Sequence, residues 1–371
     1  PITDDAQASA YYGRTYLAWT RFINPFPIVV SYTTNGGANW TAFTQVNNTF
    51  NGNRSYGPSM SIGSNGEVYV CWASILATSP FNEDKIGFAV STNGGLNWSA
   101  NENAYDCNGI KASQLSPWQI RANGYPLMDI DKTGGPRNGW LYIVTAEKNL
   151  APAGTDPDVI MHRSTNGGQA WSSGIRVNQD VINNGKIQFF PIVRVDEGGG
   201  LNVLYYDNRL TSDSTVDVFL SRSTDGGTNW FDFRVSNHRF KPKSPSGSPG
   251  NMGDNIGITS GNGKLYPVWM SDFSVVFQAW STIIDYSLFG IKQIGSEIPK
   301  EFALLQNYPN PFNPITKIRF NIPSKENVSL EVYNINGSLL KTVLNQQMNA
   351  GKYETDFDGS NFASGIYFYM L

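Results

Sequence analysis

Short runs of apolar residues recur along the chain up to about residue 290, and Gly, Pro, Asn or Asp residues separate them. Many of these runs are rich in β-branched and aromatic residues, and five of them share one pattern: "TYLAW" at 15–19, "VYVCW" at 68–72, "LYIVT" at 141–145, "NVLYY" at 202–206 and "LYPVW" at 265–269. Runs of this length that end in turn-forming residues predict β-strands. The pattern therefore predicts an all-β protein.

An eight-residue motif follows four of these predicted strands: "TTNGGANW" at 33–40, "STNGGLNW" at 91–98, "STNGGQAW" at 164–171 and "STDGGTNW" at 223–230. Asn-Gly-Gly or Asp-Gly-Gly between two strands supplies the positive φ angles of a tight hairpin turn. The tryptophan can fold back over the turn and bury its apolar face. We interpret the motif as a hairpin connection whose structural residues are Asn35, Trp40, Asn93, Trp98, Asn166, Trp171, Asp225 and Trp230.

The motif tryptophans recur every 58 to 73 residues, a period that fits three or four short strands and their turns. A further apolar run precedes the second, third and fourth units, as in "GYPLMDID" at 124–131. Four antiparallel strands per repeat is the arrangement of a β-propeller blade. The five shared strands predict five recognisable blades in a closed ring, the fifth without the motif, and leave a sixth, diverged blade open.

The motif and the blade order resemble the Asp-box, or BNR, repeats of sialidase-like propellers over residues 10–290. This resemblance raises the question of glycoside hydrolysis, because enzymes of the sialidase family grip a substrate carboxylate with three arginines and use a Tyr–Glu pair and an Asp. The first arginine of that family stands in an F/Y-R-I-P motif, and "RIP" does not occur here. The arginines near blade strands stand outside the family's motif context: Arg14, Arg121, Arg194 and Arg209.

The other candidate groups receive structural interpretations. The glutamates of this region fall largely in or beside turn-like segments: Glu67, Glu83, Glu102, Glu147 and Glu197. Neither His162 nor His238 lies near a nucleophile motif. Asp129 and Asp131 lack the further oxygen ligands of a calcium loop, and Asp207 with Arg209 is interpreted as an internal ion pair. The sequence thus predicts a non-catalytic protein with no metal site and no cofactor.

The chain changes character after about residue 297. Alternating strands within "LLQNYPNPFNPITKIRFNIP" (304–323) and "VYNINGSLL" (332–340) are separated by Pro-rich, Asn-Gly and Asp-Gly turns. This pattern predicts a small β-sandwich. We therefore expect an Asp-box propeller at residues 1–296 and an Ig-like sandwich at residues 297–371.

The second segment resembles the C-terminal sorting domain of proteins exported by the type IX (Por) secretion system, through the two stretches above and "ASGIYFYML" at 363–371. The resemblance implies a Bacteroidetes-type bacterium, the type IX machinery as a partner, and release or surface attachment. Family members continue past "GIYFY" with a further strand, so the sandwich is expected to lack its last strand. An open strand edge near Leu371 invites a neighbouring copy to pair and form a polymer. The other interpretation is that the last residues are missing and nothing replaces them.

Composition and charge limit the kinds of molecule that this protein is expected to bind. The net charge is −3, and Lys and Arg are scattered singly, which argues against nucleic acid. No apolar run reaches the roughly 18–20 residues of a membrane span, and Pro1 indicates a mature chain. If the protein is exported, Cys71 and Cys107 can form one disulfide. The alternative is that Cys71 is a buried thiol.

Together these patterns predict a secreted, non-catalytic structural or binding protein of the cell surface or extracellular space. Self-assembly through the sandwich edge would make it a homopolymer, and a polar, low-charge surface would suit a glycan. Two alternatives are kept. One is a sialidase-like glycoside hydrolase acting at the propeller mouth, and the other is a monomeric glycan-binding adhesin.

Overall fold

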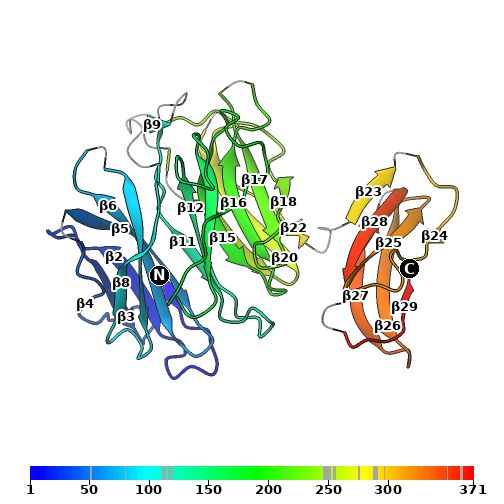
Figure 1. Cartoon of the computed structure of the whole chain (residues 1–371), viewed down its shortest axis with the longest axis horizontal. Coiled ribbons are helices and arrows are strands. Elements are labelled where there is room, and N and C mark those ends of the chain that lie inside the picture. The colour runs from blue at the N-terminus through cyan, green and yellow to red at the C-terminus, as the bar shows by residue number, and fades with distance from the viewer. Residues whose placement is uncertain are drawn as a thin grey trace. The chain divides into compact units, whose positions relative to one another are not determined.

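The chain folds into β-strands in two compact units, Pro1–Ile283 and Ile284–Leu371, which are described separately (Figure 1). The computed structural model describes the whole chain except residues 51, 80, 111–113, 116, 117, 119, 213, 245–251, 254, 255, 275, 287–290, 296, 349, 360 and 361. No α-helix occurs among the described residues. A search of the same residues for a helix long and apolar enough to cross a membrane finds none.

Among its described residues, the first unit contains five larger antiparallel sheets, whose strands pair in chain order, and one two-stranded sheet. Sheet 1 consists of β1 (Ile2–Thr3), β2 (Thr15–Thr20), β3 (Ile28–Thr33) and β4 (Thr44–Gln45), and sheet 2 of β5 (Asn53–Ile62), β6 (Val68–Leu76), β7 (Glu83–Ser91) and β8 (Ser99–Asp106). Sheet 3 consists of β11 (Leu127–Ile130), β12 (Leu141–Glu147), β13 (Asp158–Ser164) and β14 (Ile175–Arg176), and sheet 4 of β15 (Gln188–Val195), β16 (Leu201–Asp207), β17 (Asp217–Ser223) and β18 (Phe231–Arg234). Sheet 5 consists of β19 (Gly257–Gly261), β20 (Lys264–Ser271) and β21 (Gln278–Ser281), and β22 (Ile284–Asp285) lies at the start of the second unit.

Neighbouring sheets are in contact: β2 of sheet 1 packs against β5, and the first strands of the other sheets pack in series, β5 against β11 and β11 against β15 (Figure 1). β15 in turn packs against β19. A short hairpin of β9 (Gln114–Leu115) and β10 (Ile120–Arg121) is inserted between sheets 2 and 3. Four-stranded sheets packed face to face in this way have the organisation of propeller blades. The predictions of an all-β chain and of four strands per repeat are confirmed.

The predicted hairpin motifs connect the third and fourth strands of sheets 1 to 4. In sheet 1 the side-chain oxygen of Asn35 accepts a hydrogen bond from the Asn39 N–H at 3.0 Å, and Gly36 and Gly37 have φ of 69° and 92°. The side chains of Asn93, Asn166 and Asp225 accept the equivalent bond at 2.9, 2.9 and 3.0 Å. The polar residue of each motif thus closes its turn, and the glycines supply the backbone conformation.

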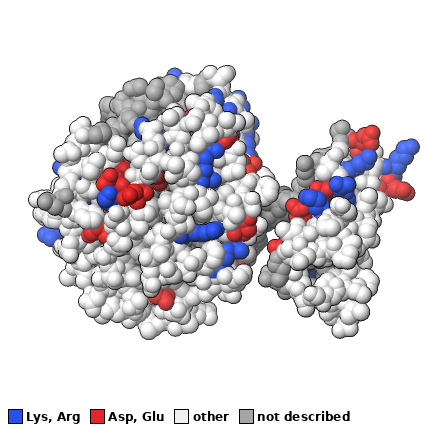
Figure 2. All heavy atoms as spheres, in the orientation of Figure 1, with Lys and Arg blue, Asp and Glu red and all other residues white. Residues whose placement is uncertain are grey.

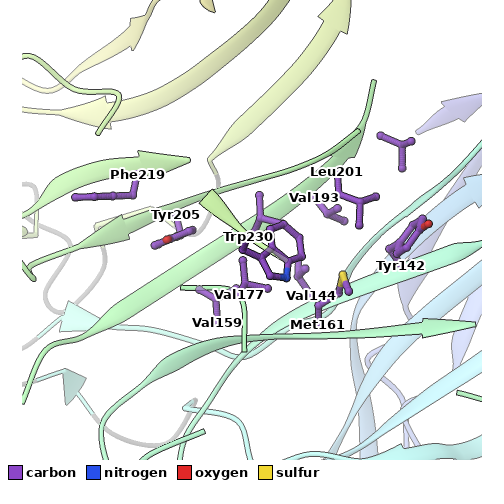
Figure 3. Packing of buried hydrophobic residues seen from close by; sticks show 12 residues of the cluster. Tyr142, Val144, Val159, Met161, Val177, Val193, Leu201, Tyr205, Phe219 and Trp230 are labelled. Carbon is purple, nitrogen blue, oxygen red and sulfur yellow. The ribbon is translucent and has the colours of Figure 1, made fainter. Parts of the chain in front are cut away.

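The motif tryptophan of sheet 4 lies in the core between sheets 3 and 4. Trp230 is buried among side chains of both sheets, and Figure 3 shows its ring within this cluster: Tyr142, Val144, Val159, Met161, Val177, Val193, Leu201, Tyr205 and Phe219. Its indole N–H donates to the Gly227 carbonyl at 3.1 Å. Trp230 therefore fixes its own turn and also joins two sheets.

Both cysteines are free, buried thiols in this structure. Cys71 lies on β6 and Cys107 directly after β8, and both belong to one apolar cluster between sheets 2 and 3. Burial raises the pKa of each thiol, so both are protonated at neutral pH. A disulfide between them stays a prediction for the exported protein.

The second unit is a sandwich of two sheets. One sheet has the order β23 (Ile291–Gly295), β28 (Gly351–Asp358), β25 (Ile315–Ile322) and β24 (Ala303–Leu304), and the other has the order β27 (Leu339–Met348), β26 (Glu326–Asn334) and β29 (Tyr367–Met370). Apolar side chains from both sheets form one core that includes Phe320, Leu330 and Phe357. Strand β23, which the sequence places in the first domain, pairs with β28 here. Strand β29 pairs with β26 at the edge of its sheet, and Phe368 and Met370 are exposed there.

Candidate functional site

A pocket of about 310 Å³ lies where β2 ends and β5 begins, beside the segment that follows β10. Because successive strands run antiparallel, the ends of the second strands and the starts of the first strands lie at the same end of the sheets. We call this cavity the aromatic pocket. Its lining residues are Thr20, Phe22, Tyr56, Gly57, Arg121, Ala122, Asn123 and Tyr125.

Aromatic rings form one wall of the aromatic pocket. The ring centroids of Phe22 and Tyr56 are 5.6 Å apart, and Phe26 contacts Tyr56 at 6.2 Å. The Arg54 guanidinium lies 4.8 Å from the centroid of the Phe26 ring. Phe22 is largely exposed, so its ring is open to solvent. Exposed rings beside a few polar groups are the usual composition of a site for a small organic ligand.

Gly57 brings β5 close to Tyr125. Its φ is 62°, and the pairing of β5 with β6 shifts register between Tyr56 and Ser59. A Cβ atom added at Gly57 would lie 2.5 Å from Cγ of Tyr125. Glycine is therefore required at this bulge, since a side chain would displace the ring that lines the pocket.

Two carboxyl groups lie behind the wall of the aromatic pocket. The Gly124 N–H, between the lining residues Asn123 and Tyr125, donates to Oε1 of Glu83 at 3.0 Å. Glu83 begins β7 and is 0% exposed, and Glu147 ends β12 and is 1% exposed. Gly109 joins the two, because its N–H donates to the Glu83 carbonyl and its backbone forms a bridge with Glu147.

Glu147 interacts with hydrogen-bond donors and with a second carboxylate. The Thr145 hydroxyl donates to Oε1 at 2.5 Å, and the Asn108 N–H donates to Oε2 at 3.3 Å. Burial raises the pKa of Glu147 to about 7, the two hydrogen bonds oppose this rise, and the nearby charge of Glu83 adds to it. Glu147 can therefore hold a proton near neutral pH.

Acids at the corresponding strand starts of sheets 3 and 4 are paired with arginines. Asp158 begins β13 and accepts from Arg176 Nε at 2.7 Å. Asp217 begins β17 and accepts from Nε of Arg234 at 2.7 Å and of Arg239 at 3.1 Å. These ion pairs are structural and hold the starts of β13 and β17.

The predicted internal ion pair of sheet 4 is present. Arg209 Nε donates to Oδ2 of Asp207 at 2.6 Å, and the same guanidinium contacts Asp232 and the Tyr205 hydroxyl. Burial raises the pKa of Asp207 to about 6, although the charge of Arg209 opposes that rise. The Arg209 guanidinium therefore links the end of β16 to β18, and we interpret its role as structural.

A second pocket, of about 270 Å³, lies at the opposite ends of the first strands. Asp129 contacts the Arg194 guanidinium at 3.6 Å and accepts the Val195 N–H at 2.8 Å. Asp131 instead accepts the N–H and hydroxyl of Thr133, which makes it a turn residue. Among the described residues, no group of three or more His, Cys, Asp or Glu side chains could hold a metal ion.

The other residues considered from sequence are dispersed. Arg14 lies 4.1 Å from the Tyr32 ring and donates to the Gly94 carbonyl, whereas Arg121 lines the aromatic pocket and Arg194 lines the second pocket. His162 stacks on Tyr105, and His238 lies between Phe273 and Trp280: the ring centroids are 3.9, 4.3 and 4.5 Å apart. The structure does not gather these arginines as a carboxylate-binding triad.

The C-terminal segment has a recognised family. Residues 306–371 match the family model described as a secretion system C-terminal sorting domain. The chain carries this domain. The predicted type IX sorting domain is confirmed, and the protein is secreted to the cell surface or the extracellular space. No curated protein matches the chain.

Several solved structures are similar to the whole chain at low identity. A protein of unknown function from Dyadobacter fermentans has 12% identity and a TM-score of 0.46, over 91% of this chain and 86% of that one. A Penicillium chrysogenum α-L-arabinanase complexed with arabinobiose has 15% identity and a TM-score of 0.48, over 95% and 91%. An α-L-arabinofuranosidase of Fusarium graminearum has 12% identity and a TM-score of 0.45, and the match covers 94% of this chain and 90% of that one.

This comparison corrects one prediction. The sequence predicts a protein that is not an enzyme, but the similar solved structures include glycoside hydrolases. The non-catalytic prediction is therefore withdrawn. At these identities and TM-scores the likeness assigns no reaction to this chain, and the sialidase resemblance of the hairpin motifs stays a prediction.

Proposed function

We propose that the protein is a secreted glycoside hydrolase that binds a glycan in the aromatic pocket and uses Glu147 and Glu83 for the reaction. The observation that carries this proposal is the position of the two carboxyl groups directly behind the pocket wall, where the Gly124 N–H reaches Glu83. Paired carboxyl groups with different environments are the usual machinery of glycoside hydrolysis.

The environments of the two groups suggest their roles. Glu147, whose pKa burial raises to about 7, would protonate the glycosidic oxygen as the acid. Glu83, which accepts the Gly124 N–H at the pocket wall, would act as the base or nucleophile. Both groups are buried, so this reaction requires that the wall formed by Asn123 and Gly124 move aside for the substrate.

The pocket suits a neutral or weakly charged sugar. Aromatic rings such as Phe22 and Tyr56 present flat apolar faces to the C–H groups of a sugar ring, and Asn123 and Arg121 offer polar groups beside them. Figure 2 shows that residues other than Lys, Arg, Asp and Glu make up most of the visible surface. A glycan is therefore the proposed ligand of the aromatic pocket. We also propose that the first unit is an Asp-box propeller of five blades.

The test is release of reducing ends from a panel of polysaccharides that includes arabinan and xylan. We expect Glu147→Gln and Glu83→Gln each to lower the rate by at least about 100-fold. Glu67→Gln is the matched control, because Glu67 accepts hydrogen bonds from Asn65 in a turn at the other end of sheet 2. Full activity in Glu147→Gln, or no product from any polysaccharide, would reject the hydrolase.

Glycan binding in the aromatic pocket can be tested separately from cleavage with the Glu147→Gln variant, which is expected to cleave at least about 100-fold more slowly than the wild type. A polysaccharide should retard this variant in affinity electrophoresis. Phe22→Ala and Tyr56→Ala should then abolish the retardation. Unchanged retardation in both variants would exclude the aromatic pocket as the site.

We also propose that the second unit is an Ig-like sandwich whose β29 edge can pair with a neighbouring copy. The exposed apolar side chains of Phe368 and Met370 on this edge support the proposal. A Phe368→Lys variant should remove any self-association that uses the edge. Sedimentation velocity of wild type and variant at equal concentrations measures the difference, and identical behaviour would reject the polymer.

A further inference from the structure

Thr145 departs from the pattern of the neighbouring second strands. In sheets 2, 3 and 4 the first residue of the second strand pairs with the serine that begins the hairpin motif, and this pairing aligns the three strands residue by residue. Four residues further on, sheet 2 has Trp72 and sheet 4 has Tyr205, whereas sheet 3 has Thr145. Strand β12 therefore carries a small hydroxyl side chain where both neighbouring strands carry a large ring.

The hydroxyl group of Thr145 binds the side chain of Glu147. Both residues lie on β12, two positions apart, so their side chains point to the same face of the sheet. Thr145 is 0% exposed, and its hydroxyl donates to Oε1 of Glu147 at 2.5 Å, whereas the Ile160 carbonyl is 3.5 Å away. The geometry therefore directs the hydroxyl proton to the carboxyl group.

The two oxygens of Glu147 have different partners. Oε1 accepts the short bond from Thr145, whereas Oε2 accepts the Asn108 N–H at 3.3 Å, which is longer than most N–H···O bonds. A proton on Oε1 would point at the proton of the Thr145 hydroxyl. Oε2 is therefore the oxygen that can carry a proton and release it.

In sheet 4 a cation holds the equivalent acid. The residues aligned with Thr145 and Glu147 are Tyr205 and Asp207. Arg209 contacts both of these, the Tyr205 hydroxyl at 3.0 Å and Oδ2 of Asp207 at 2.6 Å. Glu147 instead accepts hydrogen bonds from neutral groups, and among the described residues no Lys or Arg forms an ion pair with it. A neutral donor favours the ionised carboxylate less than a guanidinium does, so Glu147 can still take up a proton.

The titratable groups on the strands around Glu147 are uncharged or acidic: Cys71 on β6, Glu83 on β7, Tyr105 on β8, Cys107 after β8, and Asp158 and His162 on β13. Burial raises the pKa of both thiols and of the Tyr105 hydroxyl, and it lowers the pKa of His162, so these four groups are neutral near pH 7. Asp158 is paired with an arginine, and the charge of Glu83 opposes ionisation of Glu147. Thr145 is therefore the main group that favours the ionised form of Glu147.

We propose that Thr145 is a positioning residue for Glu147: its hydroxyl holds Oε1, and Oε2 then carries the proton that is transferred. This inference rests on the proposed hydrolase function. The proton leaves Oε2 for the glycosidic oxygen, whose bond to the anomeric carbon breaks and leaves its electron pair on that oxygen. The electron pair of the O–H bond stays on the Glu147 carboxylate, which keeps the bond from Thr145. Glu83, or a water molecule that Glu83 deprotonates, attacks the anomeric carbon.

The first test measures the titration of Glu147 without any substrate. The infrared band of a protonated carboxyl group that disappears in Glu147→Gln is followed from about pH 5 to about 9. Thr145→Val removes the hydroxyl and should move the midpoint upward by about one pH unit, because the ionised form loses its shortest hydrogen bond. Thr145→Ser keeps the hydroxyl and should keep the midpoint. An unchanged midpoint in Thr145→Val, or an equal shift in Thr145→Ser, would overturn the proposal.

The second test uses a polysaccharide that the wild type cleaves. In Thr145→Val, kcat should fall by about tenfold with an unchanged KM, and the alkaline limb of the pH–rate profile should move upward with the titration midpoint. Thr211→Val is the matched control, because Thr211 is also buried and donates to the Asn208 carbonyl of its own loop. A lower kcat with an unmoved limb would mean a merely structural role and would overturn the proposal.

The two tests separate this inference from the proposed function. If the wild type cleaves no polysaccharide, the hydrolase is rejected, and the infrared titration still decides whether Thr145 controls the proton of Glu147. Thermal melts verify that each variant is folded. Thr145→Ala also removes the hydroxyl and takes the place of Thr145→Val if valine destabilises the fold.

Discussion

Glu147 and Asp158 face each other in the pairing of β12 with β13, and yet their carboxyl groups meet different surroundings. Asp158 accepts hydrogen bonds from Arg176 and Asn178, so its charge is compensated by a cation. Glu147 accepts from Thr145 and Asn108, and burial dominates its titration. The Arg176 guanidinium, which Asp158 contacts and Glu147 does not, thus makes Asp158 a structural acid and leaves Glu147 a candidate proton donor.

The raised pKa of Glu147 predicts a pH dependence of stability. The folded state keeps the Glu147 proton up to about pH 7, whereas the unfolded chain loses it near its ordinary value of 4.5. This contribution is complete below about pH 4.5 and is lost as pH rises through about 7, by roughly 3 kcal/mol at most. Urea unfolding of the wild type and of Glu147→Gln from pH 4.5 to 8 measures it. We expect a flatter profile for the variant, and parallel profiles would contradict the assignment.

Gly57 gives a second prediction at this scale. Gly57→Ala should lower the free energy of unfolding by about 1–3 kcal/mol, because φ is positive and the new methyl group meets Tyr125. It should also weaken glycan binding in the aromatic pocket. Gly261→Ala is the matched control within a strand, where an added Cβ meets nothing within 4 Å. Equal losses of stability in both variants would refute the role of Tyr125.

At the scale of elements, one hairpin motif has different consequences in different sheets. Asn35 and Asp225 close the same kind of turn, with equivalent hydrogen bonds of 3.0 Å. Trp40 and Trp230, five residues further on, differ in burial because one motif packs on a preceding sheet and the other does not. The local sequence therefore determines the turn, and the neighbouring sheet determines what the tryptophan contributes to stability.

This contrast predicts unequal effects of the same substitution. Trp230→Ala should cost about 3–5 kcal/mol of unfolding free energy, because it leaves a cavity among Met161, Val193 and Leu201. Trp40→Ala should cost less than about 1 kcal/mol, because this ring is 43% exposed. Urea unfolding followed by fluorescence measures both. Similar costs would mean that sheet 1 is packed as fully as sheet 4.

At the scale of the whole molecule, the chain consists of two units with separate cores. The core of the second unit includes Ile318, Leu330 and Phe357, and the sorting-domain match at residues 306–371 lies within that unit. A unit with its own apolar core is expected to fold independently. Export and glycan binding would then depend on different parts of the chain.

The division predicts two unfolding transitions. Calorimetry of the full chain should show two transitions, and one of them should coincide with that of residues 284–371 produced alone. β23 belongs to this fragment because it pairs with β28, so a fragment that begins at residue 297 should melt at a lower temperature. A single transition in the full chain, or no cooperative transition in the fragment, would contradict this division.

The fold could be predicted from the sequence much better than the site could. The Asn-Gly-Gly and Asp-Gly-Gly turns and the tyrosine-containing strands repeat, so each copy reinforces the interpretation of the others. The site has no such repetition. Glu83 and Glu147 are 64 residues apart and come together only because sheets 2 and 3 are neighbours. Each glutamate stands at a strand end, where the sequence alone suggests a turn residue.

The aromatic pocket was missed for the same reason. Phe22, Tyr56 and Tyr125 come from three separate stretches of the chain, and none of them stands in a recognised motif. One local signal is present in the sequence, namely Gly57, which lies within β5, because a glycine inside a strand indicates a close approach by another part of the chain. That signal shows where contact occurs but not what makes it.

The packing of the Gly-Gly turns of sheets 2, 3 and 4 against the sheet before them limits which substitutions the turns can accept. Phe88 fills the space over Gly168, and Met161 fills the space over Gly227, so each pair is matched in size and shape. A larger side chain at either glycine becomes tolerable only when the residue opposite shrinks. Deleting sheet 3 would place the Gly227 turn against Phe88 instead of Met161. The repeats therefore share one turn but are not interchangeable, because each turn fits the side chain of the sheet that precedes it.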